Sequence, residues 1–341
     1  MQEVTLIGID LGKHSFHIHG QDAAGKGIFR KKCTRKQLIT FLATFHPCTV
    51  VMEACAGAHH MARFLMSFGH AVKLINPQFV RPFVKGNKND FIDAEAICEA
   101  ASRPTMRFVT PKTEAQQLVS ALHRVRESLV CDRVKTSNQI HGILLEFGIS
   151  LPIGRTIIRH LPSALAETAL PARLIAILER LHAHYKYLDE QIAEVEKELV
   201  QQLNVDDLGQ RLLKVPGVGP ITASLLSAEL GDGKQYGCGR DFAASVGLVP
   251  RQYSTGGHAN LLGISKRGDK NLRRLLVQCA RAFMQRLDKH KGILADWVRS
   301  MLTRRHSNVV ACALANKLAR IVWALAARHT EYHAAPVPVG T

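Results

Sequence analysis

Val4-Thr-Leu-Ile-Gly-Ile-Asp10-Leu-Gly12 is the stretch that decides how the first part of the chain folds. It is apolar and of strand length, which predicts a buried strand. Its carboxylate, Asp10, is costly to bury unless a partner or a metal ion compensates the charge. The chain then turns back through Phe16 to Gly20 into a turn-rich loop at 21–25. Taken alone, the stretch is equally compatible with an Asp10 that has no functional role and only ends the strand and caps a turn.

The next residues alternate between strand and helix patterns. Such a succession predicts a parallel section of sheet whose strands are joined by right-handed crossovers. We expect strands at 28–33, 48–53 and 71–75, and helices at 35–45, with Thr34 as its N-cap, and at 57–68. The first part of the chain is therefore an α/β domain.

Three further carboxylates fall where this arrangement would gather them beside Asp10. Glu53 ends the second apolar run, although in isolation it is an ordinary strand-end residue. Asp90 and Asp93 lie three residues apart, on one face of a helix that begins near Asn89. Parallel strands end at one edge of a sheet, where ligand sites occur. Four carboxylates there would repel one another without cations, and oxygen ligands favour Mg²⁺ or Mn²⁺, a pair of which can clamp a phosphoryl transfer.

Other residues of metal-binding type are given no role. His14, His17 and His19 alternate along one strand, and we interpret them as surface or satisfied histidines. Glu95 and Glu99 lie partly off the Asp90–Asp93 face. The eight cysteines include no CxxC pair, which excludes zinc-ribbon spacing. Several lie in apolar settings, which indicates small core residues in a reducing cytoplasm.

The second half of the sequence is mainly helical. Residues 113–147 show a helical pattern with Leu118, Leu122, Val125, Leu129 and Val134 in register. Residues 171–203 form one long charged helix, either a coiled coil or an amphipathic helix packed on its own chain. A last helix at 308–328 is apolar and expected in the core, and the tail after His333 is expected to be loose.

Residues 212–230 contain Val215-Pro-Gly217-Val-Gly219 between two helical segments. This pattern resembles a helix-hairpin-helix, in which backbone N–H groups at a helix N-terminus bind a nucleic-acid phosphate. The alternative is a tight corner between two helices that serves packing only. We take Gly217 and Gly219 as candidate phosphate contacts.

The charge balance points to a polyanionic partner. The chain has 45 Lys and Arg against 28 Asp and Glu, a net charge of +17, and residues 251–305 carry over half of it. Nucleic acid is the leading partner; an anionic membrane surface is the alternative, but no signal peptide or long apolar span is evident. The candidate phosphate contacts in the basic segment are Arg251, Lys266, Arg267, Lys270, Arg273 and Arg274.

Several blocks together resemble one protein family. Gly-Ile-Asp10-Leu-Gly-Lys, Met-Glu53-Ala-Cys-Ala-Gly and Asn-Asp90-Phe-Ile-Asp93-Ala are similar to motifs of the DEDD transposases of bacterial insertion sequences. Val-Pro-Gly217-Val-Gly, Tyr-Ser254-Thr-Gly-Gly and Ser-Lys266-Arg-Gly-Asp-Lys look like the second domain of that family. The resemblance covers nearly the whole chain, in the family's order.

This resemblance implies a fold of class α/β plus α. Residues 1–150 would form an RNase H/RuvC-like DEDD domain and residues 151–205 a helical, coiled-coil connector. Residues 206–341 would form a mainly helical transposase domain that contains the helix-hairpin-helix-like motif and a catalytic serine.

The resemblance also implies a chemistry. Family members are recombinases guided by a structured bridge RNA that pairs with target and donor DNA. Ser254 would attack the scissile phosphate and hold the DNA as a phosphoserine ester, with Thr255 as the neighbouring alternative hydroxyl. Asp10, Glu53, Asp90 and Asp93 would bind Mg²⁺, with Mn²⁺ possible. The protein would act as a dimer or tetramer with shared active sites, in the bacterial cytoplasm at the nucleoid and not at a membrane.

Two other functions compete with this one. A RuvC-like endonuclease would hydrolyse junction strands with metal and water, so it would need the four acids but tolerate loss of Ser254. A non-catalytic nucleic-acid-binding protein would keep all of its activity after Asp10→Asn.

Overall fold

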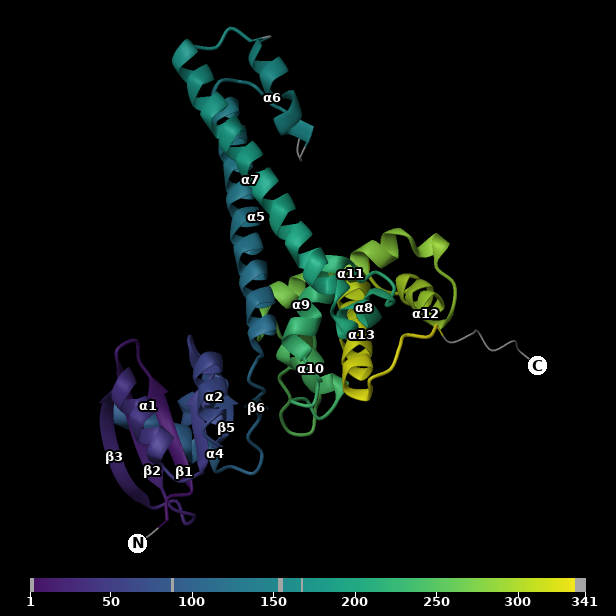
Figure 1. Cartoon of the computed structure of the whole chain (residues 1–341). Helices are drawn as coiled ribbons and strands as arrows, with labels where there is room; N and C mark the ends of the chain where they lie inside the picture. Colours follow the sequence, from purple (N-terminus) through teal and green to yellow (C-terminus); the bar gives the residue numbers. More distant parts are fainter. Residues whose placement is uncertain (1–2, 87–88, 153–155, 167, 335–341) are drawn as a thin grey trace, which may run out of the picture. The chain divides into compact units, whose positions relative to one another are not determined.

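The computed structural model describes residues 3–86, 89–152, 156–166 and 168–334. The chain divides into two compact units, Met1–Gln117 and Leu118–Thr341 (Figure 1). Each unit is described by itself. The three-part division at residues 150 and 205 stays a prediction.

A six-stranded mixed sheet forms the centre of the first unit. The order of the strands is β3-β2-β1-β4-β5-β6, in which β1, β4 and β5 are parallel to one another. The expected parallel section of the sheet is therefore confirmed, and β6 is a short antiparallel strand that the sequence pattern did not predict. The strands are β1 Leu6–Leu11, β2 Ser15–Gln21, β3 Gly27–Thr34, β4 Thr49–Glu53, β5 Ala71–Ile75 and β6 Phe108–Val109.

Helices cover both faces of this sheet. Helices α1 (Arg35–Thr44) and α2 (Ala58–Met66) pack on one face, against a core that includes Ile7 and Ile9. Helix α4 (Asp90–Ala101) packs on the other face, against β1, β2 and β4. Gly8 permits this contact, because a Cβ there would lie 2.5 Å from the carbonyl oxygen of Ala94. Two short helical turns, α3 (Pro77–Val80) and η1 (Arg81–Phe83), connect β5 to α4.

Helix starts in this unit follow from local sequence. Thr34 and Gln37 form a capping box at the start of α1, as the expected N-cap required. Asn89 Oδ1 accepts a hydrogen bond from the backbone N–H of Phe91, at 2.9 Å, and so caps α4. This cap fixes where the first turn of α4 begins, and with it the positions of Asp90 and Asp93.

The second unit begins with a pair of long helices. Helix α5 (Glu114–Glu146) starts at the end of the first unit and runs antiparallel to α7 (Ala172–Asn204). Arg126 Nε donates to Glu196 Oε1 at 2.8 Å, and Arg133 pairs with Asp189 two turns further on. The long charged helix therefore packs on its own chain, as one half of an antiparallel pair. Helix α6 (Thr156–Ala166) packs at the far end of the pair (Figure 1).

The buried face of α5 is not the one that its apolar pattern predicts. Leu118, Val125 and Val134 are about half exposed, whereas polar residues are buried. Each buried group has a polar partner: Arg133 pairs with Asp189, and His123 contacts Ser224 of helix α9 (Pro220–Leu230). Hydrogen bonds and ion pairs thus offset the cost of burial on a face that the hydrophobic period does not mark. The buried polar residues of α5 are Ser120, His123, Arg133 and Thr136.

The buried His123 predicts a pH dependence of stability. Burial, with a smaller effect of Arg126, lowers its pKa from 6.5 to about 4. The unfolded chain therefore takes up this proton first, so the free energy of unfolding should fall as the pH drops from about 6.5 toward 4, by at most about 3 kcal/mol. Denaturant unfolding across that range checks this. A His123→Gln protein should lose this part of the pH dependence, and an unchanged pH profile would contradict the prediction.

A helical bundle with one hairpin completes the second unit. Helix α13 (Ser307–Arg328) lies at its centre, packed on α10 (Gly239–Ser245) and α11 (Lys270–Gln285). Its residues Leu314, Leu318 and Val322 are fully buried. By length and composition α13 is apolar enough to cross a membrane, but half of that apolar window is buried inside the unit, as expected for a core helix. The elements are α8 Asp207–Leu213, α9 Pro220–Leu230, α10 Gly239–Ser245, β7 Pro250–Gln252, β8 Leu261–Ile264, α11 Lys270–Gln285, η2 Leu287–Lys289, α12 Ile293–Leu302 and α13 Ser307–Arg328.

Two further expectations concern cysteines and the tail. Cys33, Cys48, Cys98 and Cys279 are buried free thiols, as small core residues should be. The expectation of a loose tail falls mostly on residues 335–341, which lie outside the described residues.

Candidate active site

Strand register places three polar side chains side by side on one face of the sheet. The parallel pairing of β1 with β4 sets Ile9 opposite Met52, so the next residues, Asp10 and Glu53, end the two strands at the same edge. The antiparallel pairing of β1 with β2 sets His17 opposite Asp10. Because Ile9 and Met52 face the α1–α2 core, alternation turns Asp10 and Glu53 toward α4.

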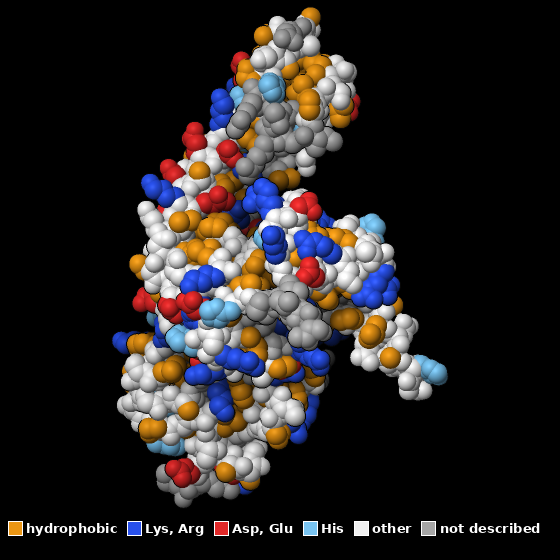
Figure 2. Space-filling view, turned by 90° about the vertical axis from the view of Figure 1, so that its right-hand side faces the viewer, with side chains coloured by type: hydrophobic (Ala, Val, Ile, Leu, Met, Phe, Trp, Pro, Cys, Tyr) orange, Lys and Arg blue, Asp and Glu red, His pale blue; other side chains and the backbone are white. Residues whose placement is uncertain are grey.

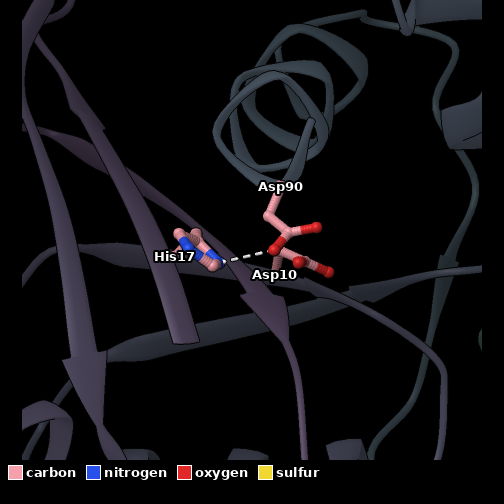
Figure 3. Close-up of side chains that lie close together, drawn as sticks. All are labelled: Asp10, His17 and Asp90. Carbon is pink, nitrogen blue, oxygen red and sulfur yellow. Dashed lines mark ion pairs between the residues drawn. The ribbon is translucent and has the colours of Figure 1, made fainter. Parts of the chain in front are cut away.

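The first turn of α4 brings the other two acids to this edge. Asp90 and Asp93 both lie in that turn, where the helix dipole favours negative charge. Asp90 Oδ2 lies 3.5 Å from His17 Nδ1, and Figure 3 shows both groups beside Asp10. Ligand atoms of Asp10, His17 and Asp90 all lie within 4.8 Å of one another, which is compatible with a shared metal ion.

Electrostatics connects Glu53 to the same group. The pKa of Glu53 is raised, first by burial and then by the charges of Asp10 and Asp93. The pKa of the Cys55 thiol is also raised, by burial and then by Glu53 and Asp10. The negative charges at this edge therefore oppose the ionisation of Glu53. The structure brings all four expected acids together in one group, and a divalent cation would relieve their repulsion.

His17 is the residue of this group that the sequence analysis missed. Its interpretation as a surface or satisfied histidine is wrong: His17 is 5% exposed, lies edge-on to Phe91 with ring centroids 4.7 Å apart, and its buried Nδ1 has no hydrogen-bond partner among the described residues. His19 is buried as well, and only His14 is exposed. The available signal was the tight turn at 12–14, since a hairpin closing there pairs residue 10 with residue 17.

The two glutamates excluded from the site have other partners. Glu95 Oε2 accepts a hydrogen bond from Arg30 at 2.5 Å, and Glu99 pairs with Arg103 one helical turn away. The negative charges of Glu95 and Glu99 are thus compensated by arginine side chains, so neither carboxylate needs a metal ion to balance its charge.

Ser254 belongs to the second unit and lies on the exposed hairpin formed by β7 and β8. Its Oγ accepts a hydrogen bond from Gln252 Nε2 at 2.8 Å and another from the backbone N–H of Asn260 at 3.3 Å. The hairpin closes at Gly256 and Gly257, with φ of +55° and +79°, a turn that favours glycine at both positions. These two donors hold the Ser254 oxygen in one position on the hairpin.

The expected phosphate contacts divide into two groups. Arg251, Lys266, Arg267 and Lys270 are exposed. Arg273 donates to the carbonyl oxygens of Val246 and Arg267, both at 3.0 Å, and Arg274 forms a two-pronged ion pair with Glu127. The guanidinium groups of Arg273 and Arg274 already bind acceptors in the protein. The four exposed residues are therefore the stronger candidates for phosphate contacts. Figure 2 shows one face of the molecule, where Lys and Arg side chains stand in groups between apolar ones.

The glycines of the 215–219 turn have different surroundings. Gly217, with φ of +85°, lies against α11: a Cβ there would stand 2.7 Å from the carbonyl oxygen of Cys279, so packing alone requires glycine. Gly219 is the N-cap of α9, and a Cβ there would meet no atom within 4 Å. Gly219 thus leaves room for a ligand at the start of α9, as a phosphate contact needs.

Comparisons with known proteins cover both units. A transposase family model, of the IS110 type with DEDD acids, matches residues 7–149, and a model described as "Transposase IS116/IS110/IS902 family" matches residues 209–292. The chain belongs to the IS116/IS110/IS902 family of transposases. The first match contains Asp10, Glu53, Asp90 and Asp93, and the second contains Ser254 and the basic segment up to Arg274.

Individual relatives agree with this membership. The transposase for insertion sequence element IS1328 of Yersinia enterocolitica is 64% identical over 332 residues, 97% of this chain and 99% of the relative. A probable family 20 transposase of Pseudomonas aeruginosa is 46% identical, over 96% and 98% of the two chains. The IS1111A transposase of Coxiella burnetii is 41% identical, over 97% and 92%. This insertion-sequence transposase is accordingly a DNA-processing enzyme.

Proposed function

We propose that this transposase cuts and rejoins DNA by phosphoryl transfer through a phosphoserine intermediate at Ser254. The observation that supports it best is the convergence of four carboxylates and His17 at one sheet edge, in a transposase whose second unit presents a hydrogen-bonded serine on an exposed hairpin. The strand order and the acids at the ends of β1 and β4 are what an RNase H/RuvC-like domain needs. The decisive measurement is whether Ser254→Ala still becomes covalently attached to DNA.

The acidic group fits a divalent cation. Its donors are carboxylate oxygens, which suit Mg²⁺ and Mn²⁺, and one imidazole nitrogen, which Mn²⁺ accepts more readily than Mg²⁺. Asp10, Glu53, Asp90 and Asp93 would hold the ion, and His17 would either join them or orient Asp90. When bound, such an ion would polarise the scissile phosphate. The N-terminus of α4 and the half-buried ends of β1 and β4 would hold these carboxylates in place.

The serine reaction conserves the phosphodiester. Ser254 Oγ would form a bond to phosphorus as the bond between phosphorus and the leaving oxygen of the DNA strand breaks. The net proton transfer is from the serine hydroxyl to that leaving oxygen. The Gln252 amide and the Asn260 N–H would hold the attacking oxygen. No water is consumed, so a second strand can reverse the step and rejoin the DNA. Both Ser254 and the acids must reach one scissile phosphate, within one chain or between copies.

The partners follow from the same proposal. A structured bridge RNA would choose target and donor DNA by base pairing, and the protein would act as a dimer or tetramer in the cytoplasm, at the nucleoid. The net charge of +17 suits two polyanionic partners. The start of α9 at Gly219 and the exposed cations Arg251, Lys266, Arg267 and Lys270 would hold phosphates.

Salt dependence tests the basic segment. Neutralising Arg251, Lys266, Arg267 or Lys270 to glutamine should lower the slope of log affinity against log salt by about one each. Arg273→Gln should leave the slope nearly unchanged, because its guanidinium is held by Val246 and Arg267. Fluorescence anisotropy with labelled duplex DNA at several salt concentrations measures this. Unchanged slopes in all four exposed variants would show that these side chains face away from nucleic acid.

A hydrolytic junction endonuclease remains the alternative function. The same acidic group would serve it, with water in place of the serine hydroxyl. The hydrogen bonds to Ser254 Oγ favour attack by the serine over hydrolysis by water, because a positioned serine oxygen has no function in hydrolysis.

A further inference from the structure

The second unit has a pocket that the proposed chemistry does not use. It has a volume of about 490 Å³, within the range of small-ligand sites, and lies between α10 and the C-terminal half of α13. It is separate in sequence from the β7–β8 hairpin and from the 251–274 basic segment. Its lining residues are Gly239, Lys317, Arg320, Ile321, Trp323, Ala324 and Arg328.

The charged part of the lining has one sign only. Lys317, Arg320 and Arg328 line the pocket together, and the described lining contains no carboxylate. Within the described part of the chain, none of the three is in an ion pair with an acid. Burial and the neighbouring Arg320 lower the pKa of Lys317, as expected for cations that lack a counter-ion. A bound anion would relieve this repulsion.

The rest of the lining is apolar and held in place. Trp323 Nε1 donates to the carbonyl oxygen of Gly233 at 3.1 Å, which fixes the orientation of the indole. Lys317 Nζ lies 4.3 Å from the centroid of the Trp297 ring, which positions that cation. Gly239 lets α10 approach α13 closely, since a Cβ there would stand 3.1 Å from Arg320 Cα. The pocket therefore has an aromatic and aliphatic wall, and the exposed Arg320 and Arg328 belong to its lining.

We propose that this pocket binds an unstacked nucleobase of a single-stranded nucleic-acid segment, with the flanking phosphates on Lys317, Arg320 and Arg328. A base offers a flat apolar face for the wall formed by Trp323 and Ile321, and its backbone supplies the anions. Free phosphate would use only the cations, and an apolar peptide only the wall. This inference extends the nucleic-acid binding of the proposed function to a second surface and does not depend on the chemistry of Ser254.

The first test compares two double variants with equal loss of charge. Arg320→Gln with Arg328→Gln removes two pocket cations. Arg173→Gln with Lys197→Gln removes two exposed cations of α7 as the control. With a labelled single-stranded oligonucleotide, the pocket variant should bind at least about fivefold more weakly, with a salt slope lower by about 1.4, and the control should match the unmodified protein. Equal binding by the two variants would overturn the proposal.

The second test detects the base itself. Trp297→Phe keeps an aromatic ring beneath Lys317 and leaves Trp323 as the sole tryptophan of the chain. Its emission should be quenched by single-stranded DNA or RNA but not by an abasic strand, polyphosphate or an acidic peptide. Parallel titrations with a DNA and an RNA oligonucleotide show which of the two nucleic acids the pocket prefers. Quenching by polyphosphate equal to that by a base-containing strand, or no quenching at all, would show that no base enters.

Adduct formation separates the two proposals. If the Arg320→Gln, Arg328→Gln variant binds single strands normally while DNA still becomes attached at Ser254, the proposed base-binding pocket is wrong and the recombination chemistry is supported. If binding falls as expected but no protein ever forms an adduct, the pocket stands and the serine mechanism fails.

Discussion

Ser254→Ala is expected to form no covalent adduct with DNA, a loss of at least about a thousandfold, the scale on which removing a nucleophile acts in enzymes. The substitution removes one exposed hydroxyl whose hydrogen bonds, among the residues that the structure describes, are with Gln252 and Asn260, so the fold and nucleic-acid binding should be unchanged. Denaturing electrophoresis of protein incubated with labelled DNA and a divalent ion detects the adduct. Anisotropy with the same DNA verifies binding.

Thr255→Ala is the matched control for this experiment. It also removes a single exposed hydroxyl from the hairpin, while the Thr255 carbonyl that accepts the N–H of His258 is kept. It should retain the adduct. If the adduct is lost in the Thr255→Ala variant and kept in the Ser254→Ala variant, the nucleophile is Thr255. Strand cleavage that survives in both proteins, without any adduct, would favour hydrolysis by water.

Glu53→Gln should have opposite effects on activity and on stability. The charge of Glu53 is opposed by burial and by Asp10 and Asp93, so at neutral pH its ionised form destabilises the folded unit. The sign follows from the raised pKa: the folded state holds the proton more tightly than the unfolded chain, and stability falls as the pH rises through this pKa. The neutral amide avoids that cost. Without divalent ions, the unfolding midpoint of the variant should therefore be equal or higher.

Activity should fall because the same charge is needed for the cation. We expect DNA cleavage to drop by about 10²-fold or more, and the rise in melting temperature produced by Mg²⁺ or Mn²⁺ to shrink. Glu99→Gln is the control, because Glu99 pairs with Arg103 outside the group and should change neither. Unchanged cleavage by both Glu53→Gln and Asp10→Asn would exclude a catalytic role for the acids and favour a protein that only binds nucleic acid.

Local sequence was sufficient for most of the elements of the first unit. The capping residues Thr34 and Asn89 and the apolar runs ending at Asp10 and Glu53 carry their signals within a few residues, and the helices and strands begin where those signals lie. The two-residue β6 was missed because so short a strand has no period of its own and exists only by pairing with β5.

Burial was harder to predict than helix position. The apolar stripe of α5 indicated one buried face, but the helix buries Ser120, His123, Arg133 and Thr136. For His123 and Arg133 the reason is that Ser224 and Asp189, more than fifty residues away in sequence, supply the polar partners. Partners so distant in sequence have no local signature.

The sequence by itself determined the succession of elements, the basic character and the positions of the acids at strand ends and on the first turn of a helix. Only the tertiary structure decided that His17 joins those acids, that Arg273 and Arg274 are held by the protein, and that cations of α13 share a pocket with Trp323. The physical reason is that a side chain's chemistry depends on its neighbours in space. Strand register and helix packing, set by the whole unit, choose those neighbours.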